Sequence, residues 1–152
     1  VLARVIGLFS GRGYNIDSLT VAEVDRQRRL SRINIVTHGT EFVIEQIKSL
    51  LGKLVPVHQV MDLTVEGPHV TRELALVKVR GDRERLVQAL RIADFMHARL
   101  ADSSPGSMVF ELTGTSDELD SFIDLVEPVE VSRAGIVAVG RGDIMLTDRE
   151  SA

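Results

Sequence analysis

The sequence contains no cysteine and no tryptophan, and its aromatic residues amount to 4% of the chain, with a single tyrosine. The lack of cysteine excludes disulfides, a thiolate nucleophile and a cysteine-ligated zinc site. No apolar run approaches the roughly 20 residues that span a bilayer. There is also no basic leader with an apolar centre. We therefore expect a cytoplasmic protein that has no membrane segment.

The sequence also lacks a field of positive charge. Its 18 Lys and Arg and its 22 Asp and Glu give a net charge of -4, with both signs interspersed. Nucleic-acid binders usually combine a basic surface with aromatic stacking residues, so we expect no nucleic-acid partner. The basic cluster Arg26, Arg28, Arg29 and Arg32 is either a solvated hairpin or a docking surface.

Helix and strand periodicities are clear in the first half of the chain. Leu2, Val5, Ile6 and Phe9 recur at helical spacing. The whole pattern predicts a helix over 2–9, strands over 16–24 and 30–38, a helix over 40–54 and a strand over 55–65. Pro56 indicates that this last strand lies at an edge or begins there, because proline cannot donate to a ladder.

A polar Gly-Pro segment over residues 66–72 indicates the boundary to a second half. There the pattern predicts a strand over 73–79, a helix around 86–93, strands over 99–102 and 108–114, a helix after Thr115 and a strand over 129–139. The nearly continuous apolar run "ELALVKV" is typical of a strand buried from both sides. Thr115 and Glu118 can form a capping box for the second helix.

The element order predicts an α+β fold of two ferredoxin-like βαββαβ domains, the first of which lacks its first strand. We place the domains at residues 1–66 and 73–142, followed by a polar tail at 143–152. The first strand is central in this arrangement, so we expect a chain truncated at its N-terminus. The uncovered sheet face and strand edges favour a dimer.

The glycine-rich stretch "SGRGYNIDSLTV", residues 10–21, resembles a phosphate-binding loop only in composition. Such loops precede a helix N-terminus, whereas these glycines follow a helix and precede a strand. We interpret Gly11 and Gly13 as residues that end the helix and turn the chain. Asn15, at the entry to the strand, is either a turn asparagine that bonds its own backbone or a ligand contact.

No group of residues indicates catalysis or metal binding. The four histidines do not have the spacing of metal ligands, and no serine stands in a G-x-S-x-G motif. We expect the acidic residues on solvent-facing helix surfaces or in turns, where nothing raises their pKa. We therefore predict neither an active site nor a metal site.

Six segments carry longer motifs: "RVIGLFSGRGYNIDSLTV", "LSRINIV", "EQIKSLLGKLVPVHQV", "RELALVKV", "ELTGTSDELDSFI" and "VEVSRAGIVAVGRG". Together they resemble the small, regulatory subunit family of acetolactate synthase (acetohydroxyacid synthase), from Val1 to about Gly142. The resemblance implies an N-terminal ACT domain and a C-terminal ferredoxin-like domain, with no catalysis of their own.

The resemblance also implies a role in the biosynthesis of valine, leucine and isoleucine. Members of the family bind the catalytic subunit, raise its activity and make it sensitive to feedback inhibition by valine. This implies a catalytic partner that carries thiamine diphosphate, magnesium and FAD, while this chain binds no cofactor. The family's effector sites lie between the paired ACT domains of a homodimer.

The family's functional residues can be placed on this sequence in part. Asn15 and Ile16 match its effector-contacting Asn-Ile pair, Ala22 matches a small residue near the same site, and Gly11 and Gly13 would shape the turn. The family's other contact loop, an acidic-Asn-x-x-Gly segment before the first helix, is absent from this sequence. The alternative hypothesis is a stand-alone amino-acid-sensing module of a transcription or metabolic regulator, which would need a helix-turn-helix partner.

Overall fold

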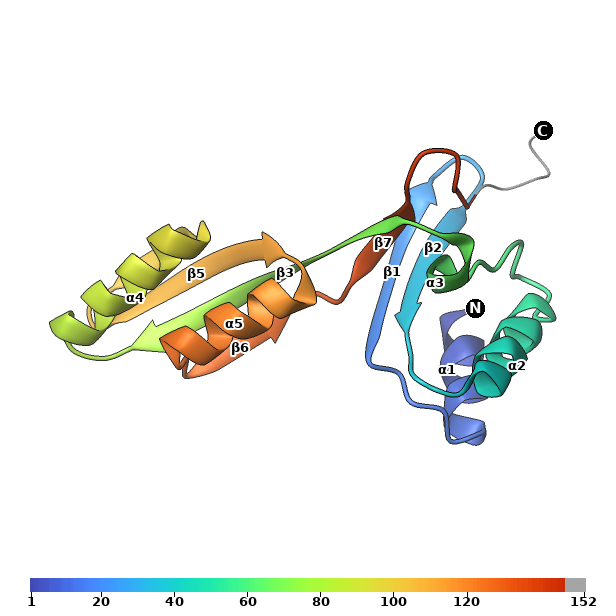
Figure 1. The fold of residues 1–152 in the computed structure, drawn as a ribbon, viewed down its shortest axis with the longest axis horizontal. Helices are drawn as coiled ribbons and strands as arrows, with labels where there is room; N and C mark the ends of the chain where they lie inside the picture. Colours follow the sequence, from blue (N-terminus) through green and yellow to red (C-terminus); the bar gives the residue numbers. More distant parts are fainter. Residues whose placement is uncertain (147–152) are drawn as a thin grey trace. The chain divides into compact units, whose positions relative to one another are not determined.

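The computed structural model describes residues 1–146 and confirms the α+β class. Its internal contacts divide the chain into two units (Figure 1). The first unit contains Val1–Val70 and the described residues from 136 to 146, and the second contains Thr71–Gly135. The chain therefore crosses between the units twice, after Val70 and after Gly135. Of the predicted tail 143–152, residues 147–152 lie outside the described part.

In the first unit, two helices pack on one face of a hairpin. Its elements are α1 (Leu2–Gly11), β1 (Ser18–Asp25), β2 (Leu30–Val36), α2 (Glu41–Gly52), α3 (Leu63–Glu66) and β7 (Val137–Gly140). The strands β1 and β2 are antiparallel, with Ser18 opposite Val36 and Ala22 opposite Arg32. Val5 and Phe9 of α1 and Ile47 and Leu51 of α2 form the core, against which Ile33 and Ile35 pack. The alternation of β2 thus determines which face of the hairpin the helices cover.

The end of α1 confirms the interpretation of the glycines as a stop and a turn. Gly11 is the last helical residue, and Gly13 takes a φ of +71°. Tyr14 N–H then donates to the Phe9 carbonyl at 2.9 Å, which closes the final turn. A residue with a Cβ rarely adopts this φ, so Gly13 is the position where glycine is required.

The strand predicted over 55–65 does not form. These residues contain no strand, and the last of them lie in the one-turn helix α3, where the Asp62 side chain accepts from Thr64 N at 3.1 Å. A strand needs a ladder partner, and the sheet of β1 and β2 has only these two strands. In the βαββαβ order the last strand pairs with the first, and the described residues contain no strand that precedes α1.

The second unit has the complete βαββαβ order. Its elements are β3 (His69–Arg80, of which the first two residues belong to the first unit), α4 (Arg83–Met96), β4 (Arg99–Ser104), β5 (Ser107–Gly114), α5 (Ser116–Val126) and β6 (Glu130–Arg133). The strands lie in the order β4-β5-β3-β6, with antiparallel neighbours. Thr115 caps α5 as predicted, because its hydroxyl oxygen accepts from Glu118 N at 3.3 Å.

The helices α4 and α5 cover one face of this sheet, and the other face is open (Figure 1). Ala75, Val77 and Val79 of β3 are buried, whereas Leu74 and Leu76 between them are 36% and 43% exposed. The prediction that this strand is buried from both sides is therefore wrong. Antiparallel sheets commonly cover one face only, and an apolar run does not distinguish the two cases.

The strand predicted over 129–139 is two strands, β6 and β7, which belong to different units. Gly135 lies between them with a φ of +98°, a conformation that other residues rarely adopt and that interrupts the strand, and β7 beyond it pairs with β3 again. The predicted second domain, 73–142, therefore ends later than the second unit, which ends at Gly135. The predicted polar break 66–72 is also shorter than expected, because β3 already begins at His69.

Candidate functional site

The turn between α1 and β1, residues 14–17, is anchored by Tyr14. The Tyr14 hydroxyl donates to Gln46 Oε1 of α2 at 2.7 Å. The Tyr14 ring meets Phe9 of α1 edge to face, with centroids 6.1 Å apart. Both α1 and α2 thus hold the residue immediately before Asn15. A side chain fixed in this way pre-organises the turn that follows it.

Asn15 presents an amide with no protein partner in the described part of the chain. Its backbone carbonyl accepts a hydrogen bond from the Thr37 hydroxyl, and its side chain is exposed and makes no bond. The alternative that Asn15 bonds its own backbone is therefore not observed. The amide can both donate and accept, as recognition of a carboxylate or an ammonium group requires.

Apolar and charged groups flank this amide. Ile16 is half-buried and packs on the core of the first unit. Asp17 N–H donates to the Val36 carbonyl at 2.8 Å, and the Asp17 carboxylate pairs with His38. The turn therefore offers one amide, one aliphatic side chain and one carboxylate within residues 15–17.

Ala22 does not join this group within one chain. It lies on β1 opposite Arg32, exposed, on the face away from the helices. Seven steps along the chain separate it from Asn15, which is roughly 23 Å if each step covers about 3.3 Å, as in an extended strand. Gly11 and Gly13 lie beside the turn with open space around them, since a Cβ built at either would meet nothing within 4 Å.

The face of the hairpin opposite the helices binds the strand β7. The Ser18 hydroxyl oxygen accepts from Ile136 N at 2.8 Å, and Arg32 Nη2 donates to the Ala138 carbonyl at 2.7 Å. Asn34 Oδ1 accepts from Ala138 N at 3.4 Å. Arg32 is thus part of an internal contact of the first unit. It is one member of the basic cluster Arg26, Arg28, Arg29 and Arg32. The polar residues that alternate along β1 and β2 could have indicated that this face contacts another segment. The same alternation, however, is also typical of a face exposed to solvent.

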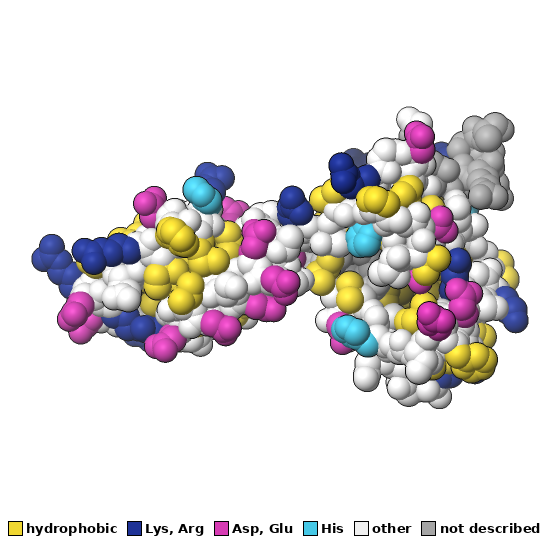
Figure 2. All heavy atoms as spheres, in the orientation of Figure 1, with side chains coloured by type: hydrophobic (Ala, Val, Ile, Leu, Met, Phe, Trp, Pro, Cys, Tyr) yellow, Lys and Arg dark blue, Asp and Glu magenta, His cyan; other side chains and the backbone are white. Residues whose placement is uncertain are grey.

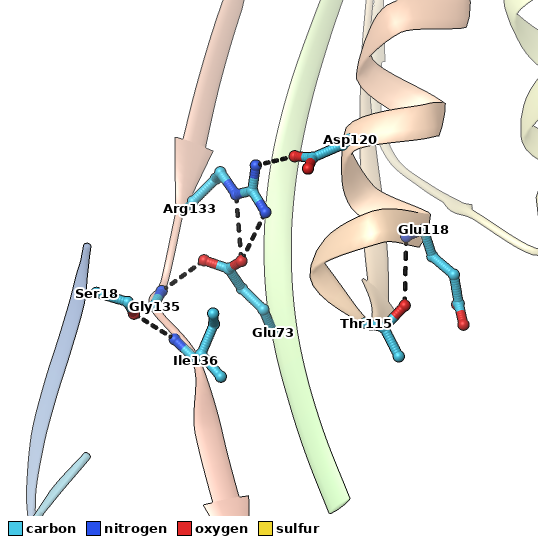
Figure 3. A network of polar contacts seen from close by, with 8 residues as sticks. All are labelled: Ser18, Glu73, Thr115, Glu118, Asp120, Arg133, Gly135 and Ile136. Atoms are coloured by element: carbon cyan, nitrogen blue, oxygen red, sulfur yellow. Dashed lines mark hydrogen bonds and ion pairs between the residues drawn. The ribbon is translucent and has the colours of Figure 1, made fainter. Parts of the chain in front are cut away.

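A second polar group, in the second unit, escaped the sequence analysis. Glu73 is 6% exposed, and its Oε1 accepts from Arg133 Nε at 3.2 Å and Nη2 at 2.7 Å (Figure 3). Its Oε2 accepts from Gly135 N at 2.9 Å, and Arg133 Nη1 reaches Asp120 Oδ1 at 2.6 Å. These hydrogen bonds, with Glu73 first and Asp120 second, raise the pKa of Arg133. The period of two could have located Glu73, because it shares the buried face of Ala75 and Val77.

No three His, Cys, Asp or Glu side chains within residues 1–146 are placed to hold a metal ion. In the same range, no helix is long and apolar enough to cross a membrane. Figure 2 shows acidic and basic side chains interspersed on the visible face of both units. The turn at Tyr14–Asp17 is therefore the candidate site for a small polar ligand.

Comparisons with known families match both units. Residues 1–59 match a family model described as an AHAS small subunit-like ACT domain. Residues 72–142 match a family model described as the small subunit of acetolactate synthase. The two models together leave out only the segment that contains α3 and the residues after 142.

Similar proteins cover nearly the whole chain. The acetolactate synthase isozyme 3 small subunit of Salmonella typhimurium is 45% identical over 93% of this chain and 88% of its own length. A probable acetolactate synthase small subunit of Archaeoglobus fulgidus is 40% identical over 94% of this chain and 90% of its own length. The crystal structure of the acetolactate synthase small subunit from Thermotoga maritima has a TM-score of 0.82 at 34% identity, and the match covers 94% of this chain and 90% of that one.

Proposed function

The chain belongs to the family of acetolactate synthase small subunits, and on this basis we propose that it regulates a catalytic subunit of that enzyme. It binds the catalytic subunit, raises its activity and makes it sensitive to valine. The observation that carries the proposal is the match of both units, in order, to the two parts of this family. The thiamine diphosphate chemistry belongs to the catalytic partner, and this chain contributes binding and regulation.

The turn at Tyr14–Asp17 is the proposed site for valine or another branched-chain amino acid. Its exposed Asn15 amide can donate to the ligand's carboxylate or accept from its ammonium group. Ile16 offers aliphatic surface to the branched side chain. The coupling free energy between an effector site and a second site is typically about 1–3 kcal/mol. The binding free energy of a ligand of this size is large enough to provide it.

A homodimer would explain how Ala22 contributes to the same site. The distance between Asn15 and Ala22 excludes a shared ligand within one chain. If two copies pair β1 edge to β1 edge in antiparallel fashion, with residues 18 and 19 nearest the two-fold axis, Asn15 of one copy faces Ala22 of the second. Pairing of this kind would also cover the exposed apolar side chains of Val21 and Val24 on β1.

Enzyme assays test the regulatory role. Acetolactate formation by the catalytic subunit is measured with increasing amounts of the full-length small subunit, with and without valine. We expect stimulation that saturates and a loss of activity on addition of valine. Absence of stimulation at every ratio of the two subunits would contradict the proposal.

Calorimetric titration of each branched-chain amino acid tests the site. Asn15→Ala should weaken binding roughly 10- to 100-fold, because a hydrogen bond to a charged group is lost. Its free energy of unfolding should change by less than about 0.5 kcal/mol, because the amide has no partner in the protein. Gln27→Ala, which removes an exposed amide at the other end of the hairpin, is the matched control. Equal affinities of the two variants would remove Asn15 from the site.

A further inference from the structure

Three contacts join the candidate turn to the residues at the end of β2 and just after it. Asp17 N–H donates to the Val36 carbonyl at 2.8 Å, and the Thr37 hydroxyl donates to the Asn15 carbonyl. His38 Nδ1 pairs with the Asp17 carboxylate. All five residues belong to the first unit. The backbone of the turn is therefore held at both Asn15 and Asp17, and it presents their side chains from fixed positions.

An amide and a carboxylate stand on either side of one aliphatic side chain in this turn. Ile16 packs on the core of the first unit, whereas Asn15 before it and Asp17 after it are exposed. Two residues of chain span at most about 7 Å, so one small molecule can reach both polar groups. This combination suits a ligand that carries an apolar group and its own positive charge.

The charge of the site is set by Asp17. Among residues 14–17 and 36–39 it is the one carboxylate, and His38 is the one basic side chain. A bond from an ammonium group to a carboxylate is about twice as strong as a bond to a neutral amide oxygen, because both partners are charged. Asp17 is therefore the stronger acceptor that the turn offers to an α-ammonium group. In the free protein this carboxylate already pairs with a nitrogen, His38 Nδ1.

The pair of Asp17 and His38 is easily exchanged for another partner. The side chain of His38 is 83% exposed and that of Asp17 is 41% exposed. Ion pairs in such positions contribute little to stability, because water solvates both groups and salt screens their attraction. An ammonium group that arrives from solvent can therefore replace the imidazole, while the backbone bond from Asp17 to Val36 stays in place.

We propose that Asp17 accepts the α-ammonium group of the effector and so selects α-amino acids against the corresponding 2-oxo acids. His38 holds the carboxylate in the free protein and yields it to the ligand. A 2-oxo acid has the carboxylate but no ammonium group, so its negative charge meets that of Asp17 with no donor between them. This inference rests on the proposed function, because it names one further group of the same ligand site.

A comparison of two ligands on the unmodified full-length protein tests the selection. Valine and 3-methyl-2-oxobutanoate, the 2-oxo acid with the same carbon skeleton, are titrated by calorimetry under the same conditions. We expect the oxo acid to bind at least about tenfold more weakly, because one hydrogen bond between charged groups is missing. Equal affinities would overturn the inference, since the ammonium group would then add nothing to binding.

Substitution of each partner separates recognition of the ligand from a merely structural role. Asp17→Asn should weaken valine binding about 10- to 100-fold, while binding of the oxo acid stays unchanged or improves because the repelling charge is removed. His38→Ala should leave valine affinity within about threefold of the unmodified protein or raise it, because Asp17 loses a competing partner. An ion pair that only orders the turn would weaken valine binding equally in both variants, and that result would overturn the inference.

Controls distinguish a failure of this inference from a failure of the proposed function. Glu66→Gln, which removes an exposed carboxylate from α3, is the matched control for net charge and should leave valine affinity unchanged. If Asp17→Asn proves unfolded in thermal unfolding, the comparison of the two ligands on the unmodified protein decides. Valine affinity that is unchanged in a folded Asp17→Asn variant would overturn the inference and leave the proposed function intact. An unmodified protein that binds no branched-chain amino acid would overturn the proposed effector and, with it, this inference.

Discussion

The two units of the chain use similar elements but complete their sheets differently. In the second unit, four strands lie under two helices, and the core draws on β3, β5, α4 and α5. In the first unit, a two-stranded hairpin packs on α1 and α2, and its buried core consists of Val5, Phe9, Ile47 and Leu51. Two-stranded hairpins are marginal without such packing, and ligand-responsive segments come from the less stable parts of proteins. The second unit is thus suited to be the scaffold and the first to respond to a ligand.

The largest expected effect concerns the core of the second unit. Phe122 is fully buried and meets Phe110 edge to face at 6.0 Å. Phe122→Ala should lower the free energy of unfolding by about 3–5 kcal/mol in urea titrations. Phe95→Ala, which truncates an exposed phenylalanine on α4, is the matched control and should change it by less than about 0.5 kcal/mol. Similar losses in both variants would mean that this core is not the main source of stability.

A smaller loss is expected for the ion pair in the same unit. Arg133→Met leaves Glu73 buried without its cation and should cost about 1–3 kcal/mol, less than for a fully buried pair because Arg133 is one-third exposed. The raised pKa of Arg133 means that the folded state holds this proton more tightly than the unfolded state. Its contribution is therefore present below the ordinary arginine pKa and is lost only as pH rises through the raised value.

Urea titrations at several pH values check this sign. The difference between the parent protein and Arg133→Met should stay constant from neutral to mildly alkaline pH, since both pKa values of Arg133 lie far above that range. A difference that shrinks within this range would show that another group titrates in the pair.

The same substitution can be made at one helix start in each unit, because a threonine caps both α2 and α5. The Thr40 hydroxyl oxygen accepts from Val43 N at 3.2 Å at the start of α2, as Thr115 does from Glu118 N for α5. Either Thr→Ala change should cost about 1 kcal/mol. Amide exchange should quicken locally in α2 for Thr40→Ala, and throughout the second unit for Thr115→Ala. The corresponding Thr→Ser variants should behave like the parent protein, and the reverse distribution would contradict the proposed division into scaffold and responsive unit.

The smallest expected effect on stability lies at the anchor of the turn. Tyr14→Phe keeps the ring contact with Phe9 but removes the bond to Gln46, and should cost about 0.5–1 kcal/mol. Calorimetry should show valine affinity reduced a few-fold, because the turn is less well ordered. Gln46→Glu keeps an acceptor for the hydroxyl and serves as the control. Unchanged affinity in Tyr14→Phe would mean that this anchor does not position Asn15.

The sequence predicted those elements whose stability is local. The helices α1, α2, α4 and α5 have clear apolar periods, and Thr115 and Gly13 mark a start and a stop. The strand expected over 55–65 did not form because a strand depends on a ladder partner, and the described residues provide none for this segment. The strand predicted over 129–139 is divided in two because Gly135 interrupts it.

The sequence predicted the position of the candidate turn, but not the hydrogen bonds between residues that are far apart in the chain. The element order placed Asn15 and Ile16 in a turn at the entry to β1, which the structure shows. Their role in effector binding, like that of Ala22, stays a prediction. The bonds of Ser18 and Glu73 join residues 118 and 62 positions apart, and no periodicity in the sequence reports such pairs.

The place of β7 has a consequence for the order of events during synthesis. Ile136, the residue immediately before β7, bonds to Ser18 over 118 positions, and the whole second unit lies between them in the sequence. At ribosomal speeds of about 5–20 residues per second, the hairpin waits on the order of ten seconds for this strand. Contacts of such long sequence separation slow folding. The second unit, which is one continuous segment of the chain, is therefore expected to fold before the first is complete.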